Sequence, residues 1–203
     1  MNYLAHAYLS FQDPEILLGN MISDFVKGKK KFDYPLPILQ GIDLHRTIDR
    51  YTDTHPATRK IKEVFQNSYG KYSGAFADIV YDHFLARDSE IFPENALWDF
   101  SQWVYGHLDR TIEKFPERFA AMYPYMKRDN WLFHYKDNFA VQRSFRGLVH
   151  RAAYLTESET AFALFEENYG LLEECYSIFF PDLLTSTANE FKMLRMKINT
   201  TNG

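Results

Sequence analysis

The sequence predicts an all-α protein that folds as a single-domain helical bundle over residues 1–203. Apolar residues recur at the three-to-four-residue spacing of amphipathic helices along almost the whole chain. No stretch shows the alternation of β-branched and polar residues that is typical of strands. Apolar residues form 46% of the chain and aromatic residues 17%, which is enough for a substantial core.

The first two helices are expected close to the N-terminus. The segment NYLAHAYLSF, residues 2–11, repeats apolar side chains on one helical face. A second helix should begin at Pro14, because proline fits the first helical turn and Asp13 before it is a good N-cap. It should continue to Gly28, because a glycine often ends a helix.

A long helix is expected from Leu36 to Asp53, because Pro56 prevents it from continuing much further. Thr54 is the expected cap of the next helix, which should close at Gly70. Another amphipathic helix should cover residues 73–88. In all, about eight to ten helices are expected, since prolines separate the later amphipathic segments. These prolines are Pro93, Pro116, Pro124 and Pro181.

Charge and composition exclude several classes of protein. The net charge is −4, so bulk electrostatics give no reason to expect nucleic acid as a partner. The single cysteine, Cys175, lies in an apolar helical segment and fits a buried thiol in a reducing compartment. No signal-peptide pattern and no membrane-length apolar run are found. We therefore expect a soluble cytoplasmic protein without a membrane partner, and the sequence leaves its oligomeric state open.

The segment GIDLHRTIDRYTDTHP, residues 41–56, is rich in ionisable groups. On a helix, His45, Asp49 and Asp53 lie four residues apart and form one polar stripe. Arg46 and Arg50 form a second stripe beside it. The first stripe could hold a divalent metal, and the second could hold a phosphate on which the metal acts. The alternative is a solvated helix face with weak ion pairs.

Three other helical segments carry acids or imidazoles among apolar neighbours. Asp82 and His83 lie in IVYDHFLA, Asp24 follows MIS, and His6 lies in YLAHAYL. Burying such groups costs several kcal/mol unless they are paired or bound to metal, although each alone could be a satisfied core residue. Their coincidence near the N-terminus predicts a site for Mn²⁺, Fe²⁺ or Zn²⁺, which accept imidazole and carboxylate ligands.

Four motifs carry a resemblance to a known family: NYLAH, GNMISDFVKG, GIDLHRTIDRYTD and DHFLAR. Their order and spacing resemble the acyl carrier protein phosphodiesterase family, and NWLFHYKD, residues 130–137, is similar to a later segment of it. The resemblance implies an all-α fold distantly like that of the HD-domain phosphohydrolases, which bind metal through histidines and aspartates. It also implies a Mn²⁺-dependent phosphodiesterase that cleaves 4′-phosphopantetheine from the serine of holo acyl carrier protein.

The resemblance assigns site residues in this chain. Residues that match the motifs are expected to converge on the metal, and they are His6, Asp24, His45, Asp49, Asp82 and His83. Asp24 and Asp49 are expected to act on the attacking water, and Arg46 and Arg50 on the phosphate. Asp53 and His55 are expected to support the ligands from outside.

The basic segment KGKKK contrasts with the acidic chain around it. Carriers of this kind are small and acidic, so the segment is expected to bind the partner, with a solvated loop as the alternative. The residues concerned are Lys27, Lys29, Lys30 and Lys31. Two other functions agree with the sequence. One is an HD-type phosphohydrolase acting on a nucleotide such as guanosine polyphosphate, and the other is a metal-free helical interaction protein.

Overall fold

The computed structural model describes the backbone of residues 1–201 and the side chains of residues 1–196. Residues 1–201 contain eleven α-helices, four short 3-10 helices and no strand, which confirms the predicted all-α class. The α-helices are α1 (Tyr3–Tyr8), α2 (Pro14–Ile22), α3 (Leu36–Thr54), α4 (Pro56–Tyr69), α5 (Ser73–Arg87), α6 (Ala96–Asp109), α7 (Glu117–Arg128), α8 (Trp131–His134), α9 (Asn138–Arg151), α10 (Glu159–Glu167) and α11 (Tyr169–Thr201). The 3-10 helices are η1 (Ser23–Phe25), η2 (Gly28–Asp33), η3 (Gly70–Tyr72) and η4 (Ile112–Lys114).

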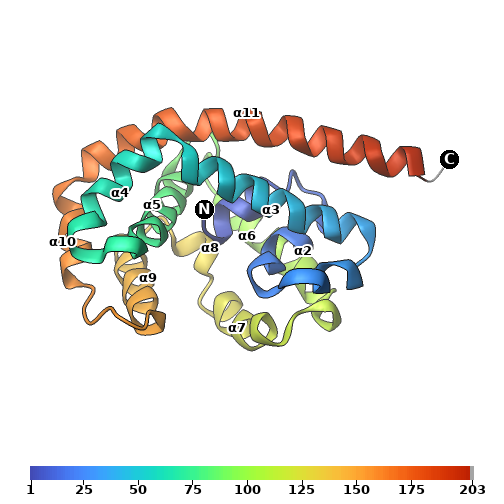
Figure 1. The fold of residues 1–203 in the computed structure, drawn as a ribbon, viewed down its shortest axis with the longest axis horizontal. Helices are drawn as coiled ribbons and strands as arrows, with labels where there is room; N and C mark the ends of the chain where they lie inside the picture. The colour runs from blue at the N-terminus through green and yellow to red at the C-terminus, as the bar shows by residue number, and fades with distance from the viewer. Residues whose placement is uncertain (202–203) are drawn as a thin grey trace.

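Helix α11 runs along one side of the molecule and packs against α3, α4 and α5 (Figure 1). Helices α4, α9 and α10 lie toward one end, α2 lies toward the other, and α7 lies near the middle on the side opposite α11. The chain begins near the middle, where the short helix α1 packs against α2 and α5. Buried side chains from nearly all of these helices form one hydrophobic core. The arrangement places α1 and its histidine at the centre of the molecule.

The apolar periodicity in the sequence corresponds to the buried faces of the helices. On α4, Ala57, Ile61, Phe65 and Tyr69 are four residues apart, and all four are buried. The helix ends at Gly70, whose φ of 51° is readily adopted by glycine alone. The predicted end of this helix is therefore confirmed.

Helices α2 and α3 touch at their backbones. A Cβ atom on Gly19 would lie 2.0 Å from the carbonyl oxygen of Ile38, and one on Gly41 would lie 2.3 Å from that of Ile16. Only glycine at these two positions allows the helices to approach so closely. Because Asn20 follows Gly19, the close crossing brings the backbone carbonyl of Asn20 up to α3.

Some helix boundaries differ from the prediction. Asp13 caps α2 as expected, with its carboxylate accepting hydrogen bonds from two backbone amides at 3.1 Å. The helix ends at Ile22, however, and not at Gly28, because the chain tightens into η1. In that turn the Ser23 hydroxyl donates a hydrogen bond to the Ile42 carbonyl at 3.3 Å. The turn therefore fixes the residue that follows Ser23 against α3.

Two further expectations about helix ends were wrong. Thr54 does not cap α4: it still belongs to α3, and Nδ1 of His55 accepts the hydrogen bond from the Ala57 amide at 3.2 Å. Pro124 and Pro181 lie inside α7 and α11 and do not separate helices. Around Pro181 the buried neighbours on α11 pack into the core, and this packing outweighs the lost backbone hydrogen bond. No helix of the described chain combines the length and hydropathy needed to cross a membrane.

Candidate metal centre

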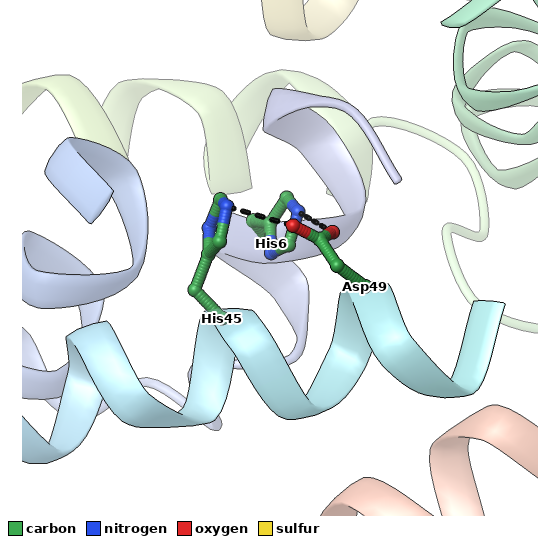
Figure 2. Close-up of side chains that lie close together, drawn as sticks. All are labelled: His6, His45 and Asp49. Atoms are coloured by element: carbon green, nitrogen blue, oxygen red, sulfur yellow. Dashed lines mark ion pairs between the residues drawn. The ribbon is translucent and has the colours of Figure 1, made fainter. Parts of the chain in front are cut away.

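Two buried histidines stack at the centre of the molecule, His6 from α1 and His45 from α3. Their ring centroids are 3.8 Å apart, with 12° between the ring planes. Asp49 lies one turn further along α3. One of its carboxylate oxygens lies 3.2 Å from His6 Nε2, and the other lies 3.1 Å from His45 Nε2 (Figure 2). The ligand atoms of the three residues all lie within 4.8 Å of one another. This spacing is close enough for them to share one cation.

The turn η1 adds Asp24 to this group. Its Oδ1 lies 3.2 Å from His45 Nε2, and its side chain is 68% exposed, whereas that of His45 is 7% exposed. Asp49 is intermediate, with a side chain 40% exposed. We call His6, Asp24, His45 and Asp49 the His/Asp cluster. Its imidazoles lie on the buried side, and its carboxylates open toward solvent.

Asn20 fixes the orientation of both imidazoles. His6 Nδ1 donates a hydrogen bond to the side-chain oxygen of Asn20 at 2.8 Å, and His45 Nδ1 donates one to its backbone carbonyl at 2.8 Å. The Asn20 amide nitrogen donates to the His6 carbonyl and to the Ser10 hydroxyl, and these contacts determine which way the amide points. Because both Nδ1 atoms donate to oxygens, both Nε2 atoms face the carboxylates. Proteins commonly orient metal-binding histidines in this way.

One atom of the cluster has no hydrogen-bond partner. Among the described side chains, His6 Nε2 is buried without a hydrogen bond, although the Asp49 carboxylate lies beside it. A nitrogen lone pair that faces a carboxylate oxygen is unfavourable unless a cation lies between them. A divalent metal would remove this conflict. The two imidazoles and two carboxylates suit Mn²⁺, Fe²⁺ or Zn²⁺, and the cluster therefore fits the metal that the sequence implied.

Protonation of the cluster follows from the same contacts. Burial lowers the pKa of His45, but hydrogen bonds with Asp24 and Asp49 outweigh it and raise that pKa to about 9. Burial and the neighbouring His45 lower the pKa of His6 to about 4. Burial raises the pKa of Asp49, but the two histidines outweigh it and hold that pKa far below its usual range. The hydrogen bond to His45 also lowers the pKa of Asp24. His45 therefore carries a second ring proton, on Nε2 beside the two carboxylates, which a bound metal would displace.

Asp82 is not brought into the cluster. Its buried carboxylate accepts hydrogen bonds from the amides of Asn2, Leu4 and Ala5, at 3.3, 2.7 and 3.3 Å. These amides belong to the start of α1, so Asp82 caps that helix from α5. Burial raises the pKa of Asp82 to about 7, although the amide donors favour the charged form. The structure therefore connects Asp82 to His6 through α1 and not through a shared metal.

His83 points to another part of the molecule. Its Nδ1 donates a hydrogen bond to the Tyr135 carbonyl at 2.8 Å, and its Nε2 accepts one from the Tyr169 hydroxyl at 2.9 Å. Burial lowers its pKa to about 4, so the ring is neutral. Because both ring nitrogens already have partners, His83 has no free lone pair for a metal. It joins α5 to the segment after α8 and to α11.

The remaining predicted residues lie around the cluster without joining it. An Arg46 guanidinium nitrogen lies 3.4 Å from the Val26 carbonyl, and the Arg50 side chain is exposed. Asp53 pairs with Lys62 at 2.7 Å, and His55 lies 3.4 Å from Asp182, so neither contacts the histidines. Within the basic segment, the ammonium group of Lys31 forms an ion pair with Asp43 at 2.8 Å. The other lysines there, Lys27, Lys29 and Lys30, are exposed in or beside η2, a few residues after Asp24.

A family model described as acyl carrier protein phosphodiesterase matches residues 1–183. The chain belongs to the acyl carrier protein phosphodiesterase family. Similar relatives carry that name in Yersinia pestis (31% identical over 185 residues, 91% of this chain and 96% of the relative) and in Photorhabdus laumondii (29% over 191 residues, 94% and 96%). A relative in Salmonella paratyphi A is 30% identical over 191 residues, 94% of this chain and 99% of its own length. No solved structure matches the chain.

In this member of the acyl carrier protein phosphodiesterase family, the sequence did not single out Asn20. An amide carries no charge and gives no motif of its own. The available signal was its place in ILLGNMI, where a polar residue stands among apolar ones as Asp24 does. Its buried amide is fully hydrogen-bonded, which agrees with a residue whose task is to position others.

Replacing Asn20 by leucine should weaken metal binding about 10–100-fold, because His6 loses the acceptor that orients its ring. The backbone carbonyl that holds His45 remains, so binding should not be abolished. Titration of the purified variant with Mn²⁺ measures the effect. Gln40→Leu is the matched control, because Gln40 is also a buried amide but contacts the Leu194 carbonyl on α11. Equal affinities in both variants would contradict the role of Asn20.

Proposed function

We propose that the His/Asp cluster binds a divalent metal such as Mn²⁺ and hydrolyses the phosphodiester that joins 4′-phosphopantetheine to the serine of holo acyl carrier protein. The proposal depends on the buried His6 Nε2, which lacks a hydrogen bond and lies 3.2 Å from the Asp49 carboxylate, with the ring of His45 stacked on its own. The name of the related proteins supports the carrier protein as substrate. The reaction itself leaves apo carrier protein and free 4′-phosphopantetheine.

Each residue of the cluster has a role in this proposal. His6, His45 and Asp49 would hold the metal, because their ligand atoms already converge. When bound, the ion supplies Lewis acidity to the phosphoryl oxygens and to the attacking water. Asp24 is the most exposed member and is ionised, so its free oxygen would accept a hydrogen bond from that water and orient it.

Two arginines lie beside the cluster on α3. Arg46 and Arg50 follow His45 and Asp49 by one residue each, so both point to the neighbouring face of the helix. No carboxylate among the described side chains pairs closely with Arg50, and Asp43 lies 3.9 Å from Arg46. Both guanidinium groups would neutralise the phosphodiester, the role predicted from the sequence, and Arg46 would give up its contacts with Val26 and Asp43 to do so.

Mass spectrometry of holo carrier protein tests the proposal. Incubation with the enzyme and Mn²⁺ should remove the mass of 4′-phosphopantetheine from the carrier and leave an apo carrier. The same incubation with guanosine polyphosphate should leave the nucleotide intact. An unchanged holo carrier, or turnover of the nucleotide alone, would overturn the proposed function. A protein that retains no metal after incubation with Mn²⁺ would argue for the non-catalytic alternative.

The basic segment provides a second expectation about the carrier. Replacing Lys27, Lys29 and Lys30 by glutamate should lower the association rate with carrier protein about 10–100-fold at low salt, because opposite charges steer the encounter. Lys31 is left in place because it pairs with Asp43. Stopped-flow measurements at low and high salt give the rate. The difference from wild type should shrink at high salt, where the charges are screened.

A matched charge change elsewhere provides the control. Arg59 and Lys60 are exposed on α4, and Lys192 is exposed on α11, so replacing these three by glutamate alters net charge equally. This variant should associate with the carrier at a rate close to that of wild type. Equal losses in both triple variants would show that net charge, and not the segment at η2, governs the encounter.

A further inference from the structure

A cavity of about 660 Å³ lies between the first turn of α1 and helices α5, α8 and α9. Aromatic and aliphatic side chains line it, including the buried Ile79 and Tyr135 and the half-buried Trp131. The polar side chains of Asn2 and Ser144 also face it. Volumes of about 300–1,000 Å³ with apolar walls and a few polar groups are typical of sites for small organic ligands.

The cavity lies one turn of α1 away from His6 of the His/Asp cluster. Asn2 and Tyr3 line the cavity and form the start of α1, and His6 lies one turn further along, with its amide 3.2 Å from the Asn2 carbonyl. Burial raises the pKa of the Tyr3 phenol, the nearby Asp24 carboxylate raises it further, and Arg151 of the cavity lowers it. The Tyr3 ring also packs against Trp131 of the cavity, with the two ring centroids 6.4 Å apart.

The mouth of the cavity carries unbalanced positive charge. Its two acidic residues are paired already, Asp129 with Arg143 at 2.6 Å and Asp137 with His134 at 2.8 Å. Arg146 and Arg151 are exposed at the mouth on α9. Among the side chains of residues 1–196, no carboxylate forms an ion pair with either of them. The guanidinium groups of Arg146 and Arg151 can therefore donate hydrogen bonds to amide and hydroxyl oxygens of a ligand at this opening.

We propose that this cavity binds the pantetheine arm of the substrate while the phosphodiester lies at the His/Asp cluster. The proposal rests on the proposed function and adds a binding site for the part of the substrate that does not react. The arm is a flexible chain with amide, hydroxyl and methyl groups, which suits walls of mixed apolar and polar character. The serine and the acidic carrier are attached to the other side of the phosphate, so the carrier would lie on the solvent side of the His/Asp cluster, toward Lys27, Lys29 and Lys30.

The chemistry of the reaction agrees with this placement. The oxygen of water forms a bond to phosphorus, and the bond between phosphorus and the serine oxygen breaks. The serine oxygen takes up a proton, and the phosphate remains on the arm. The product 4′-phosphopantetheine therefore keeps both groups that the enzyme recognises, the phosphate at the cluster and the arm in the cavity. Binding of this product measures the cavity without any turnover.

Gly147 allows the cavity to be filled without disturbing its helix. It lines the cavity on α9, and a Cβ atom there would meet only the flexible end of Arg151, at 3.5 Å. Gly147→Phe should weaken binding of 4′-phosphopantetheine at least about tenfold in calorimetry with Mn²⁺, because the ring occupies the space of the arm. Gly147→Ala is the matched control and should bind like wild type. Ala140→Phe places a ring in the cavity from the same helix and is the substitute variant if Gly147→Phe does not fold.

The outcomes separate this proposal from the proposed function. Wild-type affinity for 4′-phosphopantetheine in a folded Gly147→Phe or Ala140→Phe variant would overturn the cavity proposal, even if holo carrier is hydrolysed normally. If the wild-type enzyme binds 4′-phosphopantetheine, and the filled variants do not, the cavity proposal holds even if no carrier is hydrolysed. In that case only the proposed function fails. Metal content, measured in every variant, should remain that of wild type.

Discussion

Replacing His45 by alanine should remove the bound metal and lower hydrolysis of holo carrier protein about 10³-fold. His45 contacts both Asp24 and Asp49 through the same nitrogen, so its loss removes the common partner of the two carboxylates. Those carboxylates would then repel each other across an emptied space. Mn²⁺ titration and elemental analysis report the metal, and mass spectrometry of the carrier reports turnover.

A second histidine serves as the control for this change. His107 lies half-buried on α6, where its Nδ1 donates a hydrogen bond to the Trp103 carbonyl of its own helix at 2.8 Å. His107→Ala should keep wild-type metal content and activity. The helical content of both variants should match that of wild type by circular dichroism. Wild-type metal binding by His45→Ala would refute the assignment of the His/Asp cluster as the metal site.

The proximity of His45 and Asp49 follows from the sequence for a physical reason. His45 and Asp49 are four residues apart, and a helix places such residues on one face whatever surrounds it. In the structure His45 is buried beside Ile42 and Ile48, whereas the side chains of Asp49 and Asp53 become progressively more exposed along the same face. Asp24 and His6 were candidates because each stands among apolar residues in the sequence. In the structure η1, which carries Asp24, packs against α3, and α1, which carries His6, packs against α2.

The same reasoning did not separate Asp82 and His83 from the cluster, because burial alone does not identify the partner of a polar group. A carboxylate in an apolar helix can be satisfied by a metal or by amide groups of another helix. Asp82 is satisfied by the amides of α1, and His83 by Tyr135 and Tyr169. Those partners are between 52 and 86 residues away along the chain, and their approach depends on tertiary packing.

Helix type was easier to predict than helix ends for a related reason. The repeating buried positions of α4 depend only on local spacing, so the sequence shows them directly. The end of α2 depends on the contact between Ser23 and Ile42 of another helix. This turn matters for the site, because a continued α2 would carry Asp24 away from the direction in which η1 now holds it.

Asp82→Ala should lower the free energy of unfolding by about 2–4 kcal/mol, because three amides at the start of α1 lose their carboxyl acceptor inside the protein. The folded variant should still bind Mn²⁺, but about 10–100-fold more weakly, since a loosened α1 no longer holds His6 firmly. Urea unfolding gives the stability, and titration of the folded protein gives the affinity. This combination differs from that expected of a metal ligand.

Asp88→Ala separates the effect on α1 from a general loss of stability. Asp88 lies directly after α5, and its carboxylate accepts hydrogen bonds from the Tyr176 hydroxyl at 2.7 Å and the Glu90 amide at 3.0 Å. This variant should also lose stability, but it should keep wild-type metal affinity because the Asp88 carboxylate accepts no hydrogen bond from the amides of α1. Complete loss of metal from Asp82→Ala at unchanged stability would instead identify Asp82 as a ligand. Capping of α1 would then not explain why the Asp82 carboxylate is buried.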